Sequence, residues 1–268
     1  MNNIAVGNEA VKITRERKYT VNGKEITLPE EDYEEVIVIS PEDGLAMLTE
    51  GIKKYRNENM CKISVVNMDS YQAGRMYQNP LVMNFANAHN PGGGFLMGAT
   101  AQEESLCRCS TLYASLTSKK AHEMYHYNNT HASSVESDYM LISPKVAVFR
   151  DEKYNLTEPV IMGVVTVPAP NRRGAAMFAS GSLIQDTFIR RIRIMLLAAA
   201  KYGYKSLVLG AWGCGAFGNS AEKVAGYFKE VIVTEEYGKC FDEICFAVYG
   251  REDGRNISSF RNSFSPGL

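Results

Sequence analysis

Apolar and polar positions follow two periods along most of the chain. Short β-branched runs indicate strands at residues 35–40, 61–68, 80–86, 145–150, 160–168, 205–212 and 241–250. Longer segments with one apolar face indicate helices at residues 41–56, 102–116, 188–203 and 221–232. The alternation of strands and helices predicts a mostly parallel sheet with helices on both faces. Ligands of such sheets bind beyond the carboxyl ends of the strands.

The two ends of the chain lie outside this alternation. Residues 1–34 indicate a short helix and then a hairpin, with its turn at Asn22-Gly23. We expect this segment to be an extension packed on a domain that spans residues 35–255. Residues 256–268 are then expected to be a C-terminal tail.

Composition narrows the class of protein. The 268 residues are 45% hydrophobic, which is ordinary for a globular chain with a sizeable core. The formal net charge of -1 creates no overall field toward polyanions, so direct nucleic-acid binding is not indicated. No apolar run is long enough to span a membrane, and the first residues lack the pattern of an export signal. We therefore expect a cytoplasmic protein whose six cysteines are free thiols.

A glycine triplet and a pair of carboxylates follow the strand at 80–86. Residues 92–94 are all glycine, which suits a backbone that closely approaches another group or adopts positive φ. Glu103 and Glu104 then open the next helix. If one of two adjacent carboxylates is solvated and the other desolvated, one can stay protonated for general acid catalysis. Amides suited to sugar hydroxyls are supplied by Asn84, Asn87 and Asn90.

A purely structural explanation of these carboxylates stays open. The sequence Thr100-Ala-Gln-Glu103 fits a capping box with Glu103 as the third helical residue. Glu104 would then be a first-turn acid that the helix dipole favours. A helix cap does not need three glycines upstream, however, and the triplet therefore favours a binding site.

A second glycine-rich loop follows the strand at 205–212. Its glycines are Gly210, Gly213, Gly215 and Gly218, and a helix comes next. Free N–H groups at such a place attract phosphate, so the loop is a candidate pyrophosphate site. A tight turn is the alternative, but it needs only one or two glycines. Phe217 could cover a sugar or a base, or it could be a core residue below the loop.

Two other motifs carry less weight. His122-Glu123-Met-Tyr-His126 matches H-E-x-x-H, with His131 as a third possible zinc ligand. Residues 127–130 should break the helix before His131, and zinc chemistry explains neither glycine loop, so a polar helix end near solvent is favoured. The arginines of 190–193 indicate a solvated helix face, near a Gly/Ser segment at 174–182 that could form a lid.

The segment NFANAHNPGGGFLMGATAQEESLCR (84–108) resembles the signature of microbial-type poly(ADP-ribose) glycohydrolases. Three glycines, a short spacer and Gln-Glu-Glu carry the resemblance. It continues through 143–151, 165–171 and 207–219, and covers roughly residues 10–250. It implies an α/β fold, namely a macrodomain-like three-layer α/β/α architecture with a mixed, mostly parallel sheet and an N-terminal helical extension.

The resemblance also implies roles for residues. Glu104 corresponds to the catalytic acid and Glu103 to a contact with the ribose. The second glycine-rich loop would hold the diphosphate, with Phe217 over the distal ribose. Asn87 departs from the serine of many microbial members and matches the ribose-binding asparagine of simpler ADP-ribose-binding macrodomains. The implied substrate-binding residues are Gln102, Asn87, Gly92, Gly93, Gly94, Gly213, Gly215, Ala216, Phe217, Gly218 and Asn219.

The implied reaction is hydrolysis of the ribose–ribose O-glycosidic bond of poly(ADP-ribose). ADP-ribose would leave from the chain end, with Glu104 as general acid and then general base. The expected partner is ADP-ribose or poly(ADP-ribose) attached to protein, with no cofactor and no metal. Two alternatives remain open: a non-catalytic ADP-ribose-binding reader, and a hydrolase of single ADP-ribose marks on protein or nucleic acid.

Overall fold

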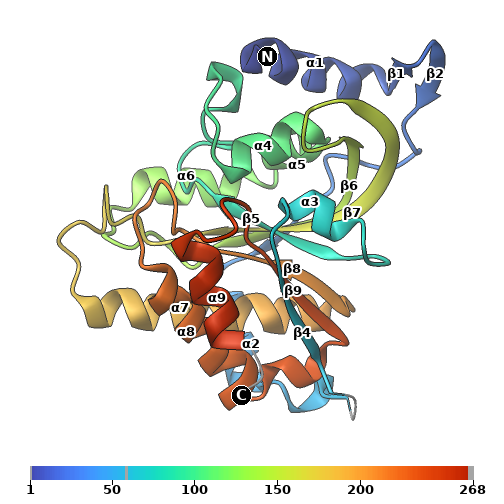
Figure 1. The fold of residues 1–268 in the computed structure, drawn as a ribbon. Helices are drawn as coiled ribbons and strands as arrows, with labels where there is room; N and C mark the ends of the chain where they lie inside the picture. The colour runs from blue at the N-terminus through green and yellow to red at the C-terminus, as the bar shows by residue number, and fades with distance from the viewer. Residues whose placement is uncertain (1, 58–59, 265–268) are drawn as a thin grey trace.

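The N-terminal segment folds as a helix followed by a hairpin. The computed structural model describes residues 2–57 and 60–264. Helix α1 (Asn3–Glu16) precedes strands β1 (Lys18–Val21) and β2 (Lys24–Thr27), at the top of Figure 1. Asn22 and Gly23 have φ angles of 50° and 81°, and a two-residue type I′ turn requires positive φ at both positions. The predicted helix and hairpin are confirmed.

The central sheet is mixed and mostly parallel, as predicted. Its strand order is β3-β6-β7-β5-β8-β9-β4. β7, β5, β8, β9 and β4 form parallel pairs, whereas β6 is antiparallel to both β3 and β7. The strands are β3 (Ile37–Ile39), β4 (Lys62–Val66), β5 (Leu81–Ala86), β6 (Met140–Arg150), β7 (Leu156–Pro168), β8 (Ser206–Leu209) and β9 (Glu243–Ala247).

Helices cover both faces of this sheet (Figure 1). In β5, Leu81 and Met83 point into one core and Val82 into the other, as the period of two requires. The first core is closed by α2 (Pro41–Glu50), α7 (Gly181–Lys201), α8 (Ala221–Lys229) and α9 (Arg255–Phe264). The second is closed by α3 (Ser70–Gly74), α4 (Gln102–Cys109), α5 (Leu112–Leu116) and α6 (His122–Thr130). Single turns lie at η1 (Lys53–Tyr55), η2 (Phe95–Met97), η3 (Glu230–Thr234) and η4 (Tyr237–Cys240).

Two predicted helices are shorter than their apolar pattern. The helix expected over 41–56 ends at Glu50, because Gly51 adopts a φ of 68° and its N–H bonds back to Met47. The helix expected over 102–116 is interrupted at Ser110, which is extended and pairs with Val148 of the sheet. In both cases the helix ends at a backbone feature that the apolar period does not indicate, namely the positive φ of Gly51 and the β-bridge of Ser110.

Two other segments are more helical than the sequence indicates. Residues 127–130 are themselves helical and continue α6, but the helix ends at Thr130 and His131 is extended, so the predicted break before His131 is confirmed. The asparagines there stay helical while their side chains donate to the carbonyls of Ala88 and His89. Residues 255–264, within or next to the predicted tail, form α9, whose Phe260 is fully buried. The division of the chain at residues 34 and 255 stays a prediction.

Arg191 of α7 fastens a loop to the carboxyl end of β7. Its side chain is fully buried, so the prediction of a solvated helix face is wrong at this position. It donates to the carbonyls of Pro168, Val135 and Glu136 and forms an ion pair with Asp138 at 2.9 Å. A buried guanidinium is tolerated when its donors are paired in this way. The clamp fixes the start of the loop that follows β7.

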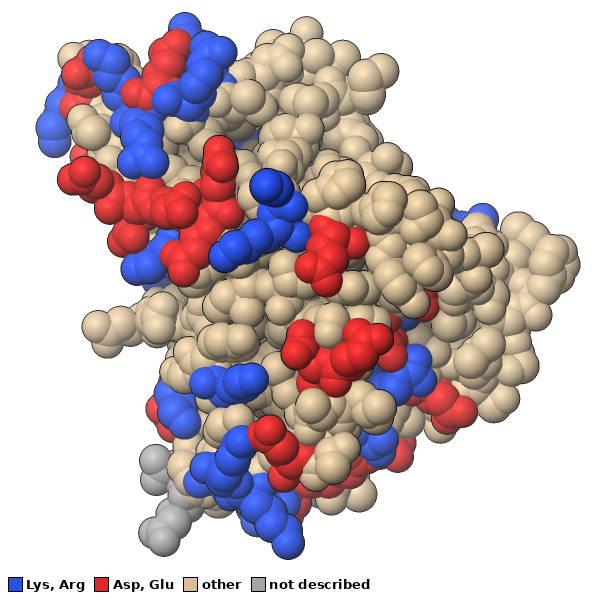
Figure 2. All heavy atoms as spheres, turned by 180° about the vertical axis from the view of Figure 1, so that it is seen from behind, with Lys and Arg blue, Asp and Glu red and all other residues tan. Residues whose placement is uncertain are grey.

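Charged side chains of both signs alternate over the rear surface. Figure 2 shows acidic and basic groups as neighbours there, with neutral areas between them. Lys18 and Glu25 of the N-terminal hairpin form one exposed ion pair of this protein, at 3.3 Å. Such pairs stabilise the fold by no more than about 1 kcal/mol each. Within residues 2–57 and 60–264, no helix is long and apolar enough to cross a membrane.

Candidate active site

The site lies beyond the carboxyl ends of the parallel strands, where the sheet topology predicts it. β5 has β7 on one side and β8 on the other, so the loops that leave these three strands are neighbours. A cavity of about 470 Å³ opens there. Its lining includes Gln102 at the start of α4 and Phe85 of β5. The loop after β8 contributes Gly213, Gly215, Ala216 and Phe217.

Glu103 is buried against the end of β5. Its side chain accepts the backbone N–H of Asn87 at 2.7 Å and the side-chain amide of Asn84 at 3.2 Å. Burial raises the pKa of Glu103 to about 8, even though these hydrogen bonds favour the ionised form. Ionisation of the adjacent Glu104 would raise the pKa of Glu103 further, so the two carboxyls oppose each other's ionisation. Asn84 and Asn87, two of the asparagines singled out in the sequence, therefore hold this carboxyl in place.

Glu104 is buried beside it but has fewer partners. Glu103 is 3% exposed and Glu104 8%, so neither is the solvated member that the sequence analysis expected. The two carboxyls differ in hydrogen bonding instead. Oε1 of Glu104 accepts the N–H of Gly94 at 3.1 Å, whereas the buried Oε2 has no hydrogen-bond partner in the described chain. A buried oxygen without a partner is rare in proteins, and here it is free to act on a ligand.

The glycine triplet forms the seat for this pair. Gly92 and Gly93 have φ angles of 69° and 57°, which side chains rarely adopt. A Cβ on Gly93 would overlap Oε1 of Glu104, and one on Gly92 would lie 3.0 Å from the Tyr113 ring. The backbone must therefore approach the carboxyl directly, and only glycine permits this.

The capping-box alternative is wrong. The N-cap of α4 is Ala101, which has no side chain able to cap, and the Glu103 side chain binds the loop after β5. Gln102 fixes the helix start instead, because its Oε1 accepts the N–H of Phe85 at 2.9 Å and its Nε2 donates to Met83 O at 2.7 Å. Its side chain thus joins the helix to β5 at the cavity wall.

The loop after β8 leaves several of its backbone N–H groups without an acceptor in the described part of the protein. Within the described chain, the N–H groups of Gly213, Gly215, Ala216 and Phe217 bond to no protein acceptor. Consecutive free N–H groups form a site for an anion such as phosphate. These four residues also line the cavity. The loop is therefore more than a tight turn.

The remaining residues of this loop have structural contacts. Gly218 has a φ of 73° and lies against Arg173. The Asn219 side chain donates to Pro170 O at 2.8 Å and to Gly213 O at 3.0 Å, so it ties the loop to the segment after β7. Neither of these residues lines the cavity. The other predicted site residues also lie outside the lining and form a cluster next to Gln102, which consists of Asn87, Gly92, Gly93, Gly94, Glu103 and Glu104.

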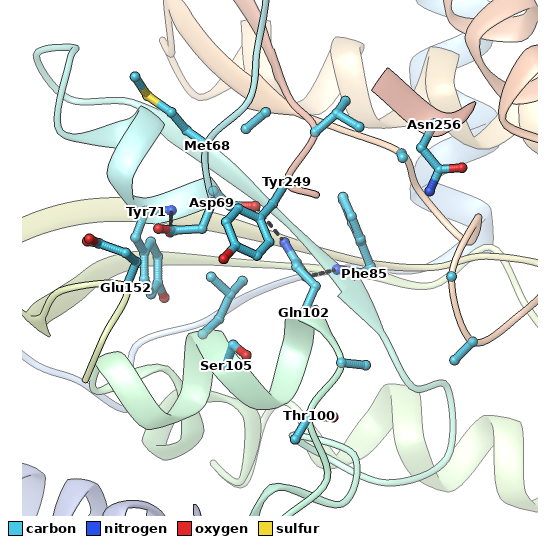
Figure 3. Close-up of a pocket in the computed structure, with 18 of the residues that line it drawn as sticks. Met68, Asp69, Tyr71, Phe85, Thr100, Gln102, Ser105, Glu152, Tyr249 and Asn256 are labelled. Carbon is cyan, nitrogen blue, oxygen red and sulfur yellow. Dashed lines mark hydrogen bonds between the residues drawn. The ribbon is translucent and has the colours of Figure 1, made fainter. Parts of the chain in front are cut away.

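The opposite end of the cavity contains residues that the sequence analysis missed. Figure 3 shows Asp69, Glu152 and Tyr249 at this end, from three separate segments. Asp69 caps α3 through Oδ1, while its buried Oδ2 has no partner in the described residues. Burial raises the pKa of Asp69. For this end of the cavity the sequence offered one signal, an aspartate directly after the strand at 61–68. Tyr249 offered none, because it is an ordinary exposed residue.

The histidine motif does not converge on a site. In α6, Glu123 accepts a hydrogen bond from the Tyr139 hydroxyl at 2.9 Å, and the rings of His122 and His126 stack 5.5 Å apart. Throughout the described ranges, no three His, Cys, Asp or Glu side chains group closely enough to bind a metal ion.

Fold and site together define an α/β domain with a glycine-rich loop of unbonded N–H groups and a buried acid pair at the strand ends. The family model for the catalytic domain of microbial-type PARG, where PARG stands for poly(ADP-ribose) glycohydrolase, matches residues 7–151. The chain belongs to this family. Among curated proteins, none matches the chain.

Solved structures of bacterial PARGs are similar over nearly the whole chain. The enzyme from Thermomonospora curvata has a TM-score of 0.89 and 31% identity, covering 98% of this chain and 99% of its own. Its complex with the inhibitor ADP-HPD has a TM-score of 0.85 at the same identity and coverage. The Deinococcus radiodurans enzyme with ADP-ribose bound has a TM-score of 0.82 and 34% identity, covering 90% of this chain and 99% of its own.

The raised pKa of Glu103 predicts a loss of stability with rising pH. The folded protein keeps the Glu103 proton up to about pH 8, whereas the unfolded chain releases it near the ordinary value of 4.5. The contribution is therefore fully present below about pH 4.5 and is lost as pH rises through 8. Glu103→Gln, which stays neutral, should unfold at higher urea concentration than the parent at pH 9, and at a similar one at pH 4.

Urea titrations of both proteins across this range measure the effect. Glu222→Gln, which changes an exposed first-turn acid of α8, serves as the control and should follow the parent. A constant difference between Glu103→Gln and the parent at every pH would show that Glu103 is ionised in the folded protein.

Proposed function

We propose that this protein hydrolyses the ribose–ribose O-glycosidic bond of poly(ADP-ribose) and releases ADP-ribose. Membership of the PARG family and similarity to enzymes solved with ADP-ribose and ADP-HPD support the proposal. The observation that carries it is the buried Glu103–Glu104 pair beside a loop of free N–H groups. A protein that only binds ADP-ribose does not need the second buried acid.

The cavity suggests how the terminal ADP-ribose lies. The unbonded N–H groups of Gly213, Gly215 and Ala216 suit the diphosphate, and Phe217 suits the face of the distal ribose. The opposite end suits the adenine, because Asp69 Oδ2 can accept from its amino group and Tyr249 can stack on the ring. In this orientation the distal ribose points toward Gln102 and the acid pair next to it.

Proton transfer is assigned to Glu104. The protonated carboxyl donates from Oε2 to the departing 2′ oxygen while positive charge develops at the ribose carbon. Gly94 N–H holds Oε1 and so fixes the direction of Oε2. The resulting carboxylate then accepts a proton from the attacking water, which adds to the same carbon. Water is consumed, and the two products carry the new hydroxyl groups.

Glu103 and Asn87 position the sugar. Glu103 is held by one donor of β5, Asn84, and one of the loop after it, Asn87, and its carboxyl can accept from a ribose hydroxyl. The Asn87 side chain accepts the N–H groups of His89 and Asn90, which leaves its amide N–H₂ free to donate to the same sugar. Diphosphate binding at the other loop supplies the energy that orients the reacting ribose.

We further propose cleavage from the chain end, a protein-attached substrate and a cytoplasmic location. The loops after β7 and β8 are tied together by Asn219 and Pro170, which supports a site closed behind the distal ribose. The six free cysteines support a reducing compartment. The macrodomain-like character of the fold belongs to the same proposal.

Replacing Glu104 by glutamine should abolish turnover without preventing binding. The substitution keeps the shape and removes the proton, so release of ADP-ribose from the polymer should fall about 10²- to 10⁴-fold. Affinity for ADP-ribose, measured by calorimetry, should stay close to the parent's, and Glu222→Gln should keep full turnover. Release at the parent rate by Glu104→Gln would exclude this role.

The parent protein distinguishes the alternative functions. Tight ADP-ribose binding without any product would identify a non-catalytic reader. Release only from mono-ADP-ribosylated protein would identify a hydrolase of single ADP-ribose marks.

A substitution at Gly215 can distinguish an effect on ligand binding from an effect on folding. Gly215 does not have positive φ, and a Cβ there would meet nothing within 4 Å, so the protein alone does not require glycine. If the diphosphate lies against this backbone, Gly215→Val should lower ADP-ribose affinity about tenfold or more, since overpacking costs ~1–3 kcal/mol. Thermal unfolding without ligand should hardly change. Unchanged affinity would remove the diphosphate from this loop.

A further inference from the structure

Helix α1 packs directly on η2, the turn that follows the glycine triplet 92–94. Gly7 is buried in α1, and a Cβ there would lie 3.3 Å from the Phe95 ring and 3.4 Å from Phe95 O. That distance is tighter than almost all Cβ contacts, so the helix backbone itself forms the surface against Phe95. Figure 1 shows α1 lying across the end of the molecule that carries α4 and α5.

The start of α1 also contacts the end of the same turn. Asn3 donates from Nδ2 to Gly98 O at 3.3 Å, and a Cβ on Gly98 would lie 3.2 Å from Ile4. Gly98, with a φ of 84°, ends the η2 turn. α1 therefore contacts both the first residue of η2 and the residue that closes it.

Phe95 transmits this contact to the acid. It is 1% exposed, and its ring lies between α1 and Tyr113, whose ring centroid is 4.6 Å away. On the chain, Phe95 N–H donates to Gly92 O at 3.2 Å, and the residue before it is Gly94, whose N–H holds Oε1 of Glu104. A displacement of Phe95 must therefore move the peptide group that positions the Glu104 carboxyl.

A buried arginine anchors α1 relative to α4. The side chain of Arg150 is 1% exposed, forms an ion pair with Glu9, and donates to Val6 O at 3.4 Å. The same guanidinium donates to Arg108 O, in α4, at 2.9 Å. The helix that contacts η2 and the helix that carries Glu104 are thus held by one side chain.

We propose that α1 is a positioning element of the active site, with Gly7 and Phe95 as the positioning residues that set Gly94 N–H against Glu104. This inference rests on the proposed function. The N-terminal helix then does more than cover the domain, because its contact residue Phe95 directly follows the glycine triplet 92–94. Neither Gly7 nor Phe95 touches the substrate.

A size series at Gly7 tests this role. Gly7→Ala and Gly7→Val push Phe95 by increasing amounts, so kcat on poly(ADP-ribose) should fall in that order, by about 10- to 100-fold for valine, as for a catalytic group misplaced by about 1 Å. KM and ADP-ribose affinity should hardly change, because the diphosphate loop lies elsewhere. Phe95→Leu added to Gly7→Val makes room and should restore part of kcat. Gly226→Ala and Gly226→Val, at an exposed helical glycine with nothing within 4 Å, control for helix propensity.

The outcomes separate the two proposals. An inactive parent defeats the proposed function. An active parent with full kcat in both Gly7 variants defeats only the role of α1. Equal losses at Gly7 and Gly226, or a Gly7→Val loss in KM that Phe95→Leu does not relieve, also defeat it, because they indicate general destabilisation. Gly7→Ala adds one methyl group, so it provides a folded variant if the valine protein does not fold.

Discussion

The burial of two adjacent carboxyl groups at the start of α4 is the constraint on which the site depends. Removing an ionised carboxylate from water costs on the order of several kcal/mol, so each group must be hydrogen-bonded or keep its proton. Glu103 has both an N–H and an amide donor and still has a raised pKa, while Glu104 has a single N–H. Most of these donors come from one loop. That loop must therefore run within hydrogen-bond distance of α4, which explains the glycines.

The order of the strands supplies this loop with rigid neighbours. β5 lies between β7 and β8, and Asn219 and Arg191 fasten the segments that follow β8 and β7. The acid pair is thus held from the β5 side, and the glycine-rich loop after β8 is held by Asn219. Preorganised donors of this kind need not rearrange during the reaction, which is where electrostatic catalysis gains most. Helix α1 extends the same framework to the outer side of η2.

Much of the fold and part of the site follow from the sequence in physical terms. The strand and helix periods predict the layers, and the first glycine loop predicts a close approach of the backbone to another group, which proves to be the Glu104 carboxyl, because glycine requirements are local. The interruption at Ser110 was not predictable, since it depends on pairing with Val148 across the fold. The burial of Arg191 depends on carbonyls of a distant loop. Asp69 and Tyr249 are ordinary residues in sequence, and only the topology brings them to one cavity.

In the proposed reaction, Glu104 acts through a carboxyl that Gly94 fixes in place. Glu104→Asp is the sharpest test of this claim, because the acid is kept but withdrawn by one methylene group from Gly94 N–H and from the substrate. Single-turnover release of ADP-ribose from poly(ADP-ribose) should slow about 100-fold, with ADP-ribose affinity close to the parent's. A Glu104→Asp protein that releases ADP-ribose at the parent rate would contradict the claim.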